Sequence, residues 1–97
     1  MADVVVTRTQ ETDDAYTFDV GITEAGSSTR HVVTLSRADY EGQDGRWSAP
    51  EEFVSRCFKF LLEREPKESI LARFDVRDIG RYFPEFGRDV LHLHPEG

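Results

Sequence analysis

The chain has 97 residues, of which 38% are hydrophobic and 32% charged, and its formal net charge is −7 at pH 7. This length is enough for one modest core, so we expect a single domain over residues 1–97. The acidic balance argues against a nucleic-acid binder, because binding to phosphates needs a basic surface. An acidic surface could attract a basic partner, but a solvated acidic surface is the simpler interpretation.

The apolar segments and the single cysteine indicate in which cellular compartment the protein is found. The sequence has no run of about 18 apolar residues and no charged-then-apolar leader, so we expect a soluble protein with no membrane contact. Cys57 is the single cysteine. One thiol cannot form an internal disulfide, which is typical of a reducing compartment. We therefore expect a cytoplasmic protein.

The first 36 residues predict a β-meander with one apolar face. Short β-rich runs at 4–9, 15–22 and 28–35 are separated by polar turns. The second and third runs alternate, and this places one set of side chains on a shared face: Tyr16, Phe18, Val20, Ile22, His31, Val33 and Leu35. Residues 36–40, which begin with Ser36, predict a short helical turn with a capping residue.

Residues 48–65 predict the main helix. Ser48 and Glu51 have the spacing of a capping box, and Pro50 falls in the first turn, where its missing N–H is tolerated. Trp47 precedes the cap and is placed to pack as a hydrophobic staple. Pro66 is expected to end the helix. The apolar residues recur with helical spacing: Phe53, Val54, Cys57, Phe58, Phe60, Leu61 and Leu62.

The remaining residues, 66–91, predict short helices. We expect them at 66–74, at 75–83 with Asp75 as the N-cap, and as one turn within 85–90. The alternation in 90–94 leaves a terminal strand as an alternative. Strands followed by helices indicate an α+β fold. The prediction is a three-stranded antiparallel meander, followed by one main helix and two to three short helices packed on one face.

The C-terminal half resembles a family of small bacterial proteins of unknown function. The residues that carry the resemblance are Glu52–Val54, Cys57–Leu71, Phe74–Asp75 and Ile79–Phe86. The N-terminal half adds nothing to it. The resemblance implies no activity, cofactor or catalytic residue.

Cysteine and histidine are the first candidates for chemistry. Cys57 lies on the apolar face of the predicted helix, and a thiol in apolar surroundings is inert, so we expect it to be a core residue. His92 and His94 would share a face on a strand, and a metal site would need further ligands such as His31. The pair lies close to the C-terminus, where a solvated tail is the simpler interpretation.

Three arginines are the second candidate. Arg73, Arg77 and Arg81 are four residues apart, so a continuous helix would carry them as one basic stripe. Such a stripe beside Tyr82 and Phe86 could hold an anion or a nucleic acid. A helix break at Asp75 would separate the arginines, and a solvated face remains the alternative.

No glycine-rich phosphate loop or catalytic triad is recognisable, so we expect no catalytic residues and no cofactor. The leading hypothesis is a small non-enzymatic module that binds a protein partner or itself. A homodimer paired through the edge of strand 4–9 would be one form of it. The alternatives are a metal- or ligand-binding enzyme that uses the histidines, and an anion or nucleic-acid binder. The candidate interaction residues are Trp47, Arg73, Arg77, Arg81, Tyr82 and Phe86.

Overall fold

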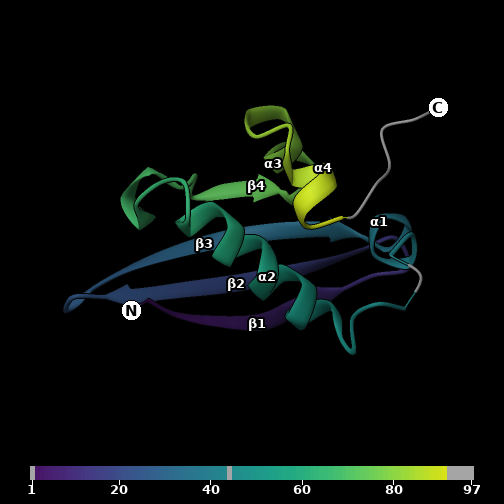
Figure 1. Ribbon diagram of the computed structural model, residues 1–97. Coiled ribbons are helices and arrows are strands. Elements are labelled where there is room, and N and C mark those ends of the chain that lie inside the picture. Colours follow the sequence, from purple (N-terminus) through teal and green to yellow (C-terminus); the bar gives the residue numbers. More distant parts are fainter. Residues whose placement is uncertain (1, 44, 92–97) are drawn as a thin grey trace.

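A four-stranded mixed sheet organises the chain (Figure 1). The computed structural model describes residues 2–43 and 45–91. Strands β1 (Asp3–Glu11), β2 (Ala15–Glu24) and β3 (Ser27–Ser36) form an antiparallel meander, and β4 (Arg73–Asp75) pairs parallel to β3. The prediction of an α+β fold is confirmed. The prediction of a three-stranded antiparallel sheet is incomplete, because the sheet has a fourth strand, β4, which is parallel to β3.

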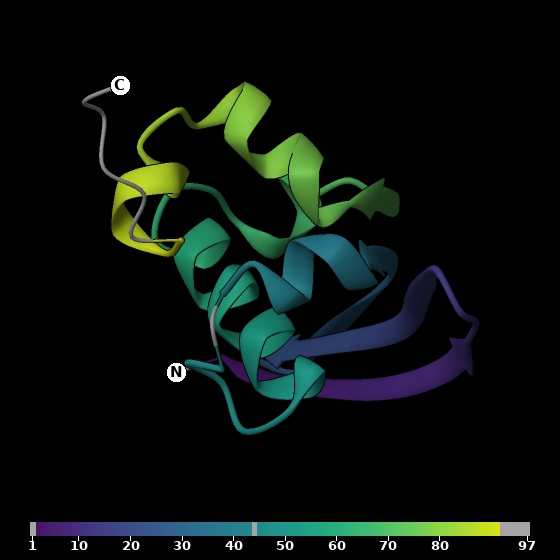
Figure 2. The ribbon, with the colours of Figure 1, turned by 90° about the vertical axis from the view of Figure 1, so that its right-hand side faces the viewer.

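The alternating residues of β2 and β3 build the floor of the core. Phe18, Val20 and Ile22 on β2 and Val33 and Leu35 on β3 are fully buried. The residues between them face away from the helices, which gather on one side of the sheet (Figure 2). The strands extend slightly beyond their predicted ends, because the β2–β3 ladder continues regularly to Glu24 and Ser27.

Strand β4 replaces a helix that the sequence predicted over 66–74. The chain forms only one 3-10 turn, η1 (Lys67–Ser69), before it becomes extended. The N–H of Val32 donates to the carbonyl of Ala72 at 2.8 Å, and Phe74 lies opposite Val33 in the parallel register. The ring of Phe74 packs against Phe58, with 5.7 Å between centroids. Tertiary pairing therefore overrides local helical propensity here.

The main helix α2 (Pro50–Leu62) lies across the sheet (Figure 1), and its predicted apolar face is buried. Its N-terminus differs from the prediction, because Ala49 is the N-cap and makes no side-chain cap bond. Ser48 instead donates from both its N and Oγ to the Oε1 of Glu52, each at 2.7 Å. Glu51 is then free to bind Arg8 on β1, at 2.8 Å to both carboxylate oxygens.

The three short helices begin at polar caps or turns. Ser36 caps α1 (Arg37–Glu41) through the N–H of Asp39, as predicted. Asp75 caps α3 (Val76–Tyr82) in a capping box, and α4 (Phe86–Asp89) follows. Val90 and Leu91 are not in a strand, and the rest of the alternative 90–94 strand lies outside the described residues. Among the described residues, no helix is long and apolar enough to cross a membrane.

Candidate docking site

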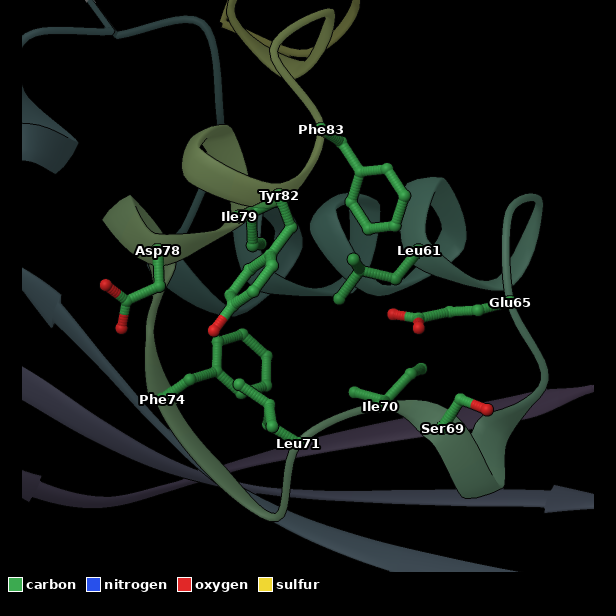
Figure 3. A pocket seen from close by; sticks show the side chains of 10 residues that line it. All are labelled: Leu61, Glu65, Ser69, Ile70, Leu71, Phe74, Asp78, Ile79, Tyr82 and Phe83. Carbon is green, nitrogen blue, oxygen red and sulfur yellow. The ribbon is translucent and has the colours of Figure 1, made fainter.

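A hollow of about 190 Å³ opens between the end of α2, the 69–71 loop, β4 and α3 (Figure 3). The side chains that matter most for its chemistry come from the end of α2 and the turn after it, from the loop before β4, and from the end of α3: Leu61, Glu65, Ile70, Leu71, Tyr82 and Phe83. Leu61 and Ile70 are buried and form the floor. The remaining walls are mostly apolar or aromatic.

The rim of the hollow exposes two large apolar side chains. Leu71 is 48% exposed and Tyr82 is 65% exposed. With Val5, these are the large hydrophobic residues that the described part of the chain leaves in solvent. Scattered apolar residues are common on protein surfaces, but two beside one apolar hollow form a patch that marks interaction sites.

Hydrogen bonds to β3 hold the rim in place. The carbonyl of Leu71 accepts from the Nδ1 of His31 at 2.8 Å, and the next carbonyl, of Ala72, accepts from the N–H of Val32. Tyr82 is the last residue of α3, whose capping box is anchored at Asp75, the last residue of β4. Both rim residues are therefore fixed by the short strand that completes the sheet.

Glu65 brings a negative charge into the hollow. Its carboxylate points into the hollow, whereas that of Asp78 points away (Figure 3). Among the residues that the structure describes, no hydrogen bond or ion pair reaches the Glu65 carboxylate. Partial burial raises its pKa above the ordinary value. Asp78, in contrast, accepts from the backbone N–H of Asp75 at 3.1 Å and lies 3.7 Å from Arg81.

The size and lining of the hollow suit a single side chain better than a substrate. Pockets for small molecules and cofactors usually enclose about 300–1,000 Å³, whereas this one encloses about 190 Å³. Neither histidine nor cysteine lines it, and its polar lining groups are Glu65, Ser69, Asp78 and the hydroxyl of Tyr82. The arrangement can bury an apolar group and pair one positive charge.

The aromatic residues proposed from the sequence divide between core and surface. Trp47 is half-buried and packs on Phe53 at 5.5 Å between centroids. Phe86 is buried against Phe60 at 5.2 Å. Of the three candidate aromatics, Tyr82 alone is exposed and lies at the hollow.

The three candidate arginines do not share one helix. Arg73 lies on β4, whereas Arg77 and Arg81 lie on α3, beyond the break at Asp75. Arg77 lies 3.8 Å from both Asp39 and Asp75, and Arg81 is near Asp78. The three arginines therefore do not form one continuous basic stripe on a single helix.

The predicted metal and thiol candidates can be placed only in part. His31 is buried between Leu71 and the hydroxyl of Thr29, which lies 2.9 Å from Nε2. His92 and His94 lie outside the described residues. Within residues 2–43 and 45–91, no three His, Cys, Asp or Glu side chains form a metal-binding group. Cys57 is fully buried, and this burial raises the pKa of its thiol, as expected for a core residue.

Sequence reasoning did not identify Glu65 or Leu71 as site residues. Glu65 directly precedes Pro66, and Leu71 falls within the helix predicted over 66–74, so neither position indicates a binding role. Their role depends on β4, which brings the 69–71 loop beside α3. No local pattern indicates this pairing, because it depends on residues about forty positions apart.

Comparisons with known proteins give no relative. No protein-family model, no curated protein and no solved structure matches the chain. The resemblance of the C-terminal half to a family of small bacterial proteins therefore stays a prediction.

Proposed function

We propose that this protein is a small non-enzymatic interaction module, and that it binds a segment of a partner protein at the Leu71–Tyr82 hollow. One observation carries the proposal: two large apolar side chains are exposed at the rim of an apolar hollow. Exposed apolar residues that adjoin a pocket mark interaction sites, and tyrosine is one of the residues enriched at binding hot spots. The favoured occupant is a basic segment, because the chain has a net charge of −7 and the hollow contains an unpaired carboxylate.

A peptide selection tests this proposal. A random peptide library displayed on phage is selected on the wild-type protein, with counter-selection on a Leu71→Ser/Tyr82→Ser double variant. Circular dichroism first establishes that the double variant is folded. We expect enriched peptides that bind the wild type and not the variant, with an excess of basic and apolar residues. If every enriched peptide binds both proteins equally, the hollow is not the docking site.

Self-association through β1 is a second candidate, and a separate observation supports it. Strand β1 lies at the edge of the sheet and pairs with β2 alone. Its ladder is regular from Asp3 to Arg8, where a bulge interrupts it. The regular part contains no lysine or proline, which commonly protect edges, and Val5 is 63% exposed.

The sequence of this edge is compatible with a two-fold axis. Two antiparallel copies centred on Val5 would place Val4 opposite Val6 and Asp3 opposite Thr7, with no like charges directly opposed. So short a contact buries less than the roughly 1,200 Å² of a stable interface, so the dimer would be weak. It would strengthen with salt, which screens the repulsion between two acidic chains.

Sedimentation equilibrium tests the edge. Val5→Lys places two like charges opposite each other at the axis, whereas Thr23→Lys adds the same charge one strand away. We expect a concentration-dependent dimer in the wild type and Thr23→Lys, and a monomer in Val5→Lys. A wild type that stays monomeric at millimolar concentration and high salt would exclude this candidate.

A further inference from the structure

The hollow contains one charged group, the carboxylate of Glu65, that receives no hydrogen bond or ion pair from the residues that the structure describes. Glu65 has its backbone fixed by a hydrogen bond from its N–H to the carbonyl of Leu61 at 3.0 Å. This bond fixes the residue in the turn after α2, from which its carboxylate enters the hollow (Figure 3). A carboxylate that is partly removed from water without a partner is unfavourable for the folded state.

Three cations of the described chain that lie close to the hollow in sequence or on α3 bind other carboxylates. Lys67, two residues on, is buried and pairs with Glu68 at 2.8 Å. Arg64 binds Glu85 at 2.8 Å and Asp89 at 3.3 Å. Arg81 is directed to Asp78, at 3.7 Å. The charge on Glu65 is therefore left for a group from outside this part of the chain.

We propose that the hollow receives the cationic side chain of a partner, an arginine or a lysine, and that Glu65 is its ionic partner. This inference rests on the proposed docking function and specifies the group that is bound. The alkyl stem of such a side chain would pack against Leu61 and Ile70. Its charged end would lie near the rings of Tyr82 and Phe83 and bind the carboxylate.

The same fold already uses this combination for its own arginines. The guanidinium of Arg64 lies 3.6 Å from the ring centroid of Phe60 while it binds Glu85. The guanidinium of Arg8 lies 5.0 Å from the ring centroid of Tyr16 while it binds Glu51. In both places, an aromatic face and a carboxylate hold one cation. The hollow presents aromatic rings and a carboxylate without the cation.

Small organic cations allow a test without knowledge of the partner. The probes are n-butylguanidinium, n-butylammonium and neutral n-pentanol, titrated into the intact protein and followed by the methyl NMR signals of Leu61, Ile70 and Leu71. The two cations distinguish arginine from lysine, and the alcohol measures the apolar contribution alone. Glu65→Gln removes the proposed ionic partner. Glu63→Gln is the matched control, because it removes an exposed carboxylate two residues away.

We expect at least one cation to bind the wild type about tenfold more tightly than pentanol, which corresponds to about 1.4 kcal/mol. In Glu65→Gln this preference should disappear, and in Glu63→Gln it should persist. Equal binding of cations and pentanol, unchanged in Glu65→Gln, would overturn the inference and leave an apolar docking site. Failure of all probes to shift the three residues would also overturn it, and the peptide selection would then judge the docking function separately.

Discussion

The buried imidazole of His31 lies 2.8 Å from the carbonyl oxygen of Leu71, so strand β3 holds the rim of the hollow directly. A carbonyl only accepts, so Nδ1 carries the proton that it donates. In the neutral ring, Nε2 is then the acceptor for the hydroxyl of Thr29. Both nitrogens are occupied in this way, which gives His31 a structural role that stabilises the rim.

Replacement of His31 should therefore affect stability and the hollow together. In His31→Leu, the carbonyl of Leu71 loses its donor, and we expect a loss of about 1–3 kcal/mol in the free energy of unfolding. Urea denaturation measures the loss, and the methyl signal of Leu71 should shift in the folded variant. Thr29→Val removes only the outer hydrogen bond and should cost less. Equal stability of His31→Leu and the wild type would contradict this role.

The exposed rim residues should contribute little to folding. Leu71→Ser and Tyr82→Ser remove side chains that are 48% and 65% exposed, so each should change the free energy of unfolding by only about 0.5 kcal/mol. Phe58→Ala, at a fully buried position, should cost about 3–5 kcal/mol. Thermal and urea unfolding of the three variants provide the comparison. A large loss in either rim variant would mean that the residue belongs to the core.

Glu65 should make stability fall as the pH rises. Burial raises its pKa in the folded protein, so the folded state holds this proton more tightly than the unfolded state does. Its favourable contribution is present below the ordinary glutamate pKa of about 4.3 and is lost as the pH rises through the folded value. Glu65→Gln should therefore have a higher melting temperature than the wild type at pH 7, and this gain should shrink near pH 4. Glu63→Gln should show no such trend. If Glu65→Gln is less stable than the wild type at pH 7, the inference that the Glu65 carboxylate is unpaired is contradicted.

The Arg8–Glu51 pair should have the opposite pH dependence. The hydrogen bonds from Arg8 lower the pKa of Glu51, so its contribution is present above the ordinary glutamate pKa and is lost as the pH falls. The pair joins β1 to α2 and is only about one-third exposed. Glu51→Gln should cost about 1 kcal/mol at neutral pH. The difference from the wild type, measured by urea denaturation, should shrink as the pH falls below the ordinary glutamate pKa of about 4.3. A difference that does not depend on pH would exclude the ionic contribution.

Most of the fold could be predicted from local patterns. The alternation in β2 and β3 has the period of a strand, and the apolar spacing of α2 has the period of a helix, so both buried faces followed directly. The cap residues Ser36 and Asp75 marked α1 and α3. The predicted capping box of α2 is wrong, because Ser48 binds Glu52 and Glu51 binds Arg8, 43 residues away.

The candidate site could not be predicted in the same way. Strand β4 has three residues, too few for a period to be recognised, and it exists because Phe74 and Ala72 find partners on β3. Without β4, no local sequence pattern places Leu71 and Tyr82 on the same rim. Tyr82 was proposed as an interaction residue from its aromatic character alone, and the meaning of Glu65 depends entirely on three-dimensional packing.

The most direct test of the docking account is the affinity of one selected library peptide for two proteins. Isothermal titration would compare the wild type with the folded Leu71→Ser/Tyr82→Ser variant. The account predicts at least a tenfold weaker dissociation constant for the variant, because the rim residues supply the buried contact. The same dissociation constant for both proteins would show that peptides bind elsewhere, and the account would be wrong.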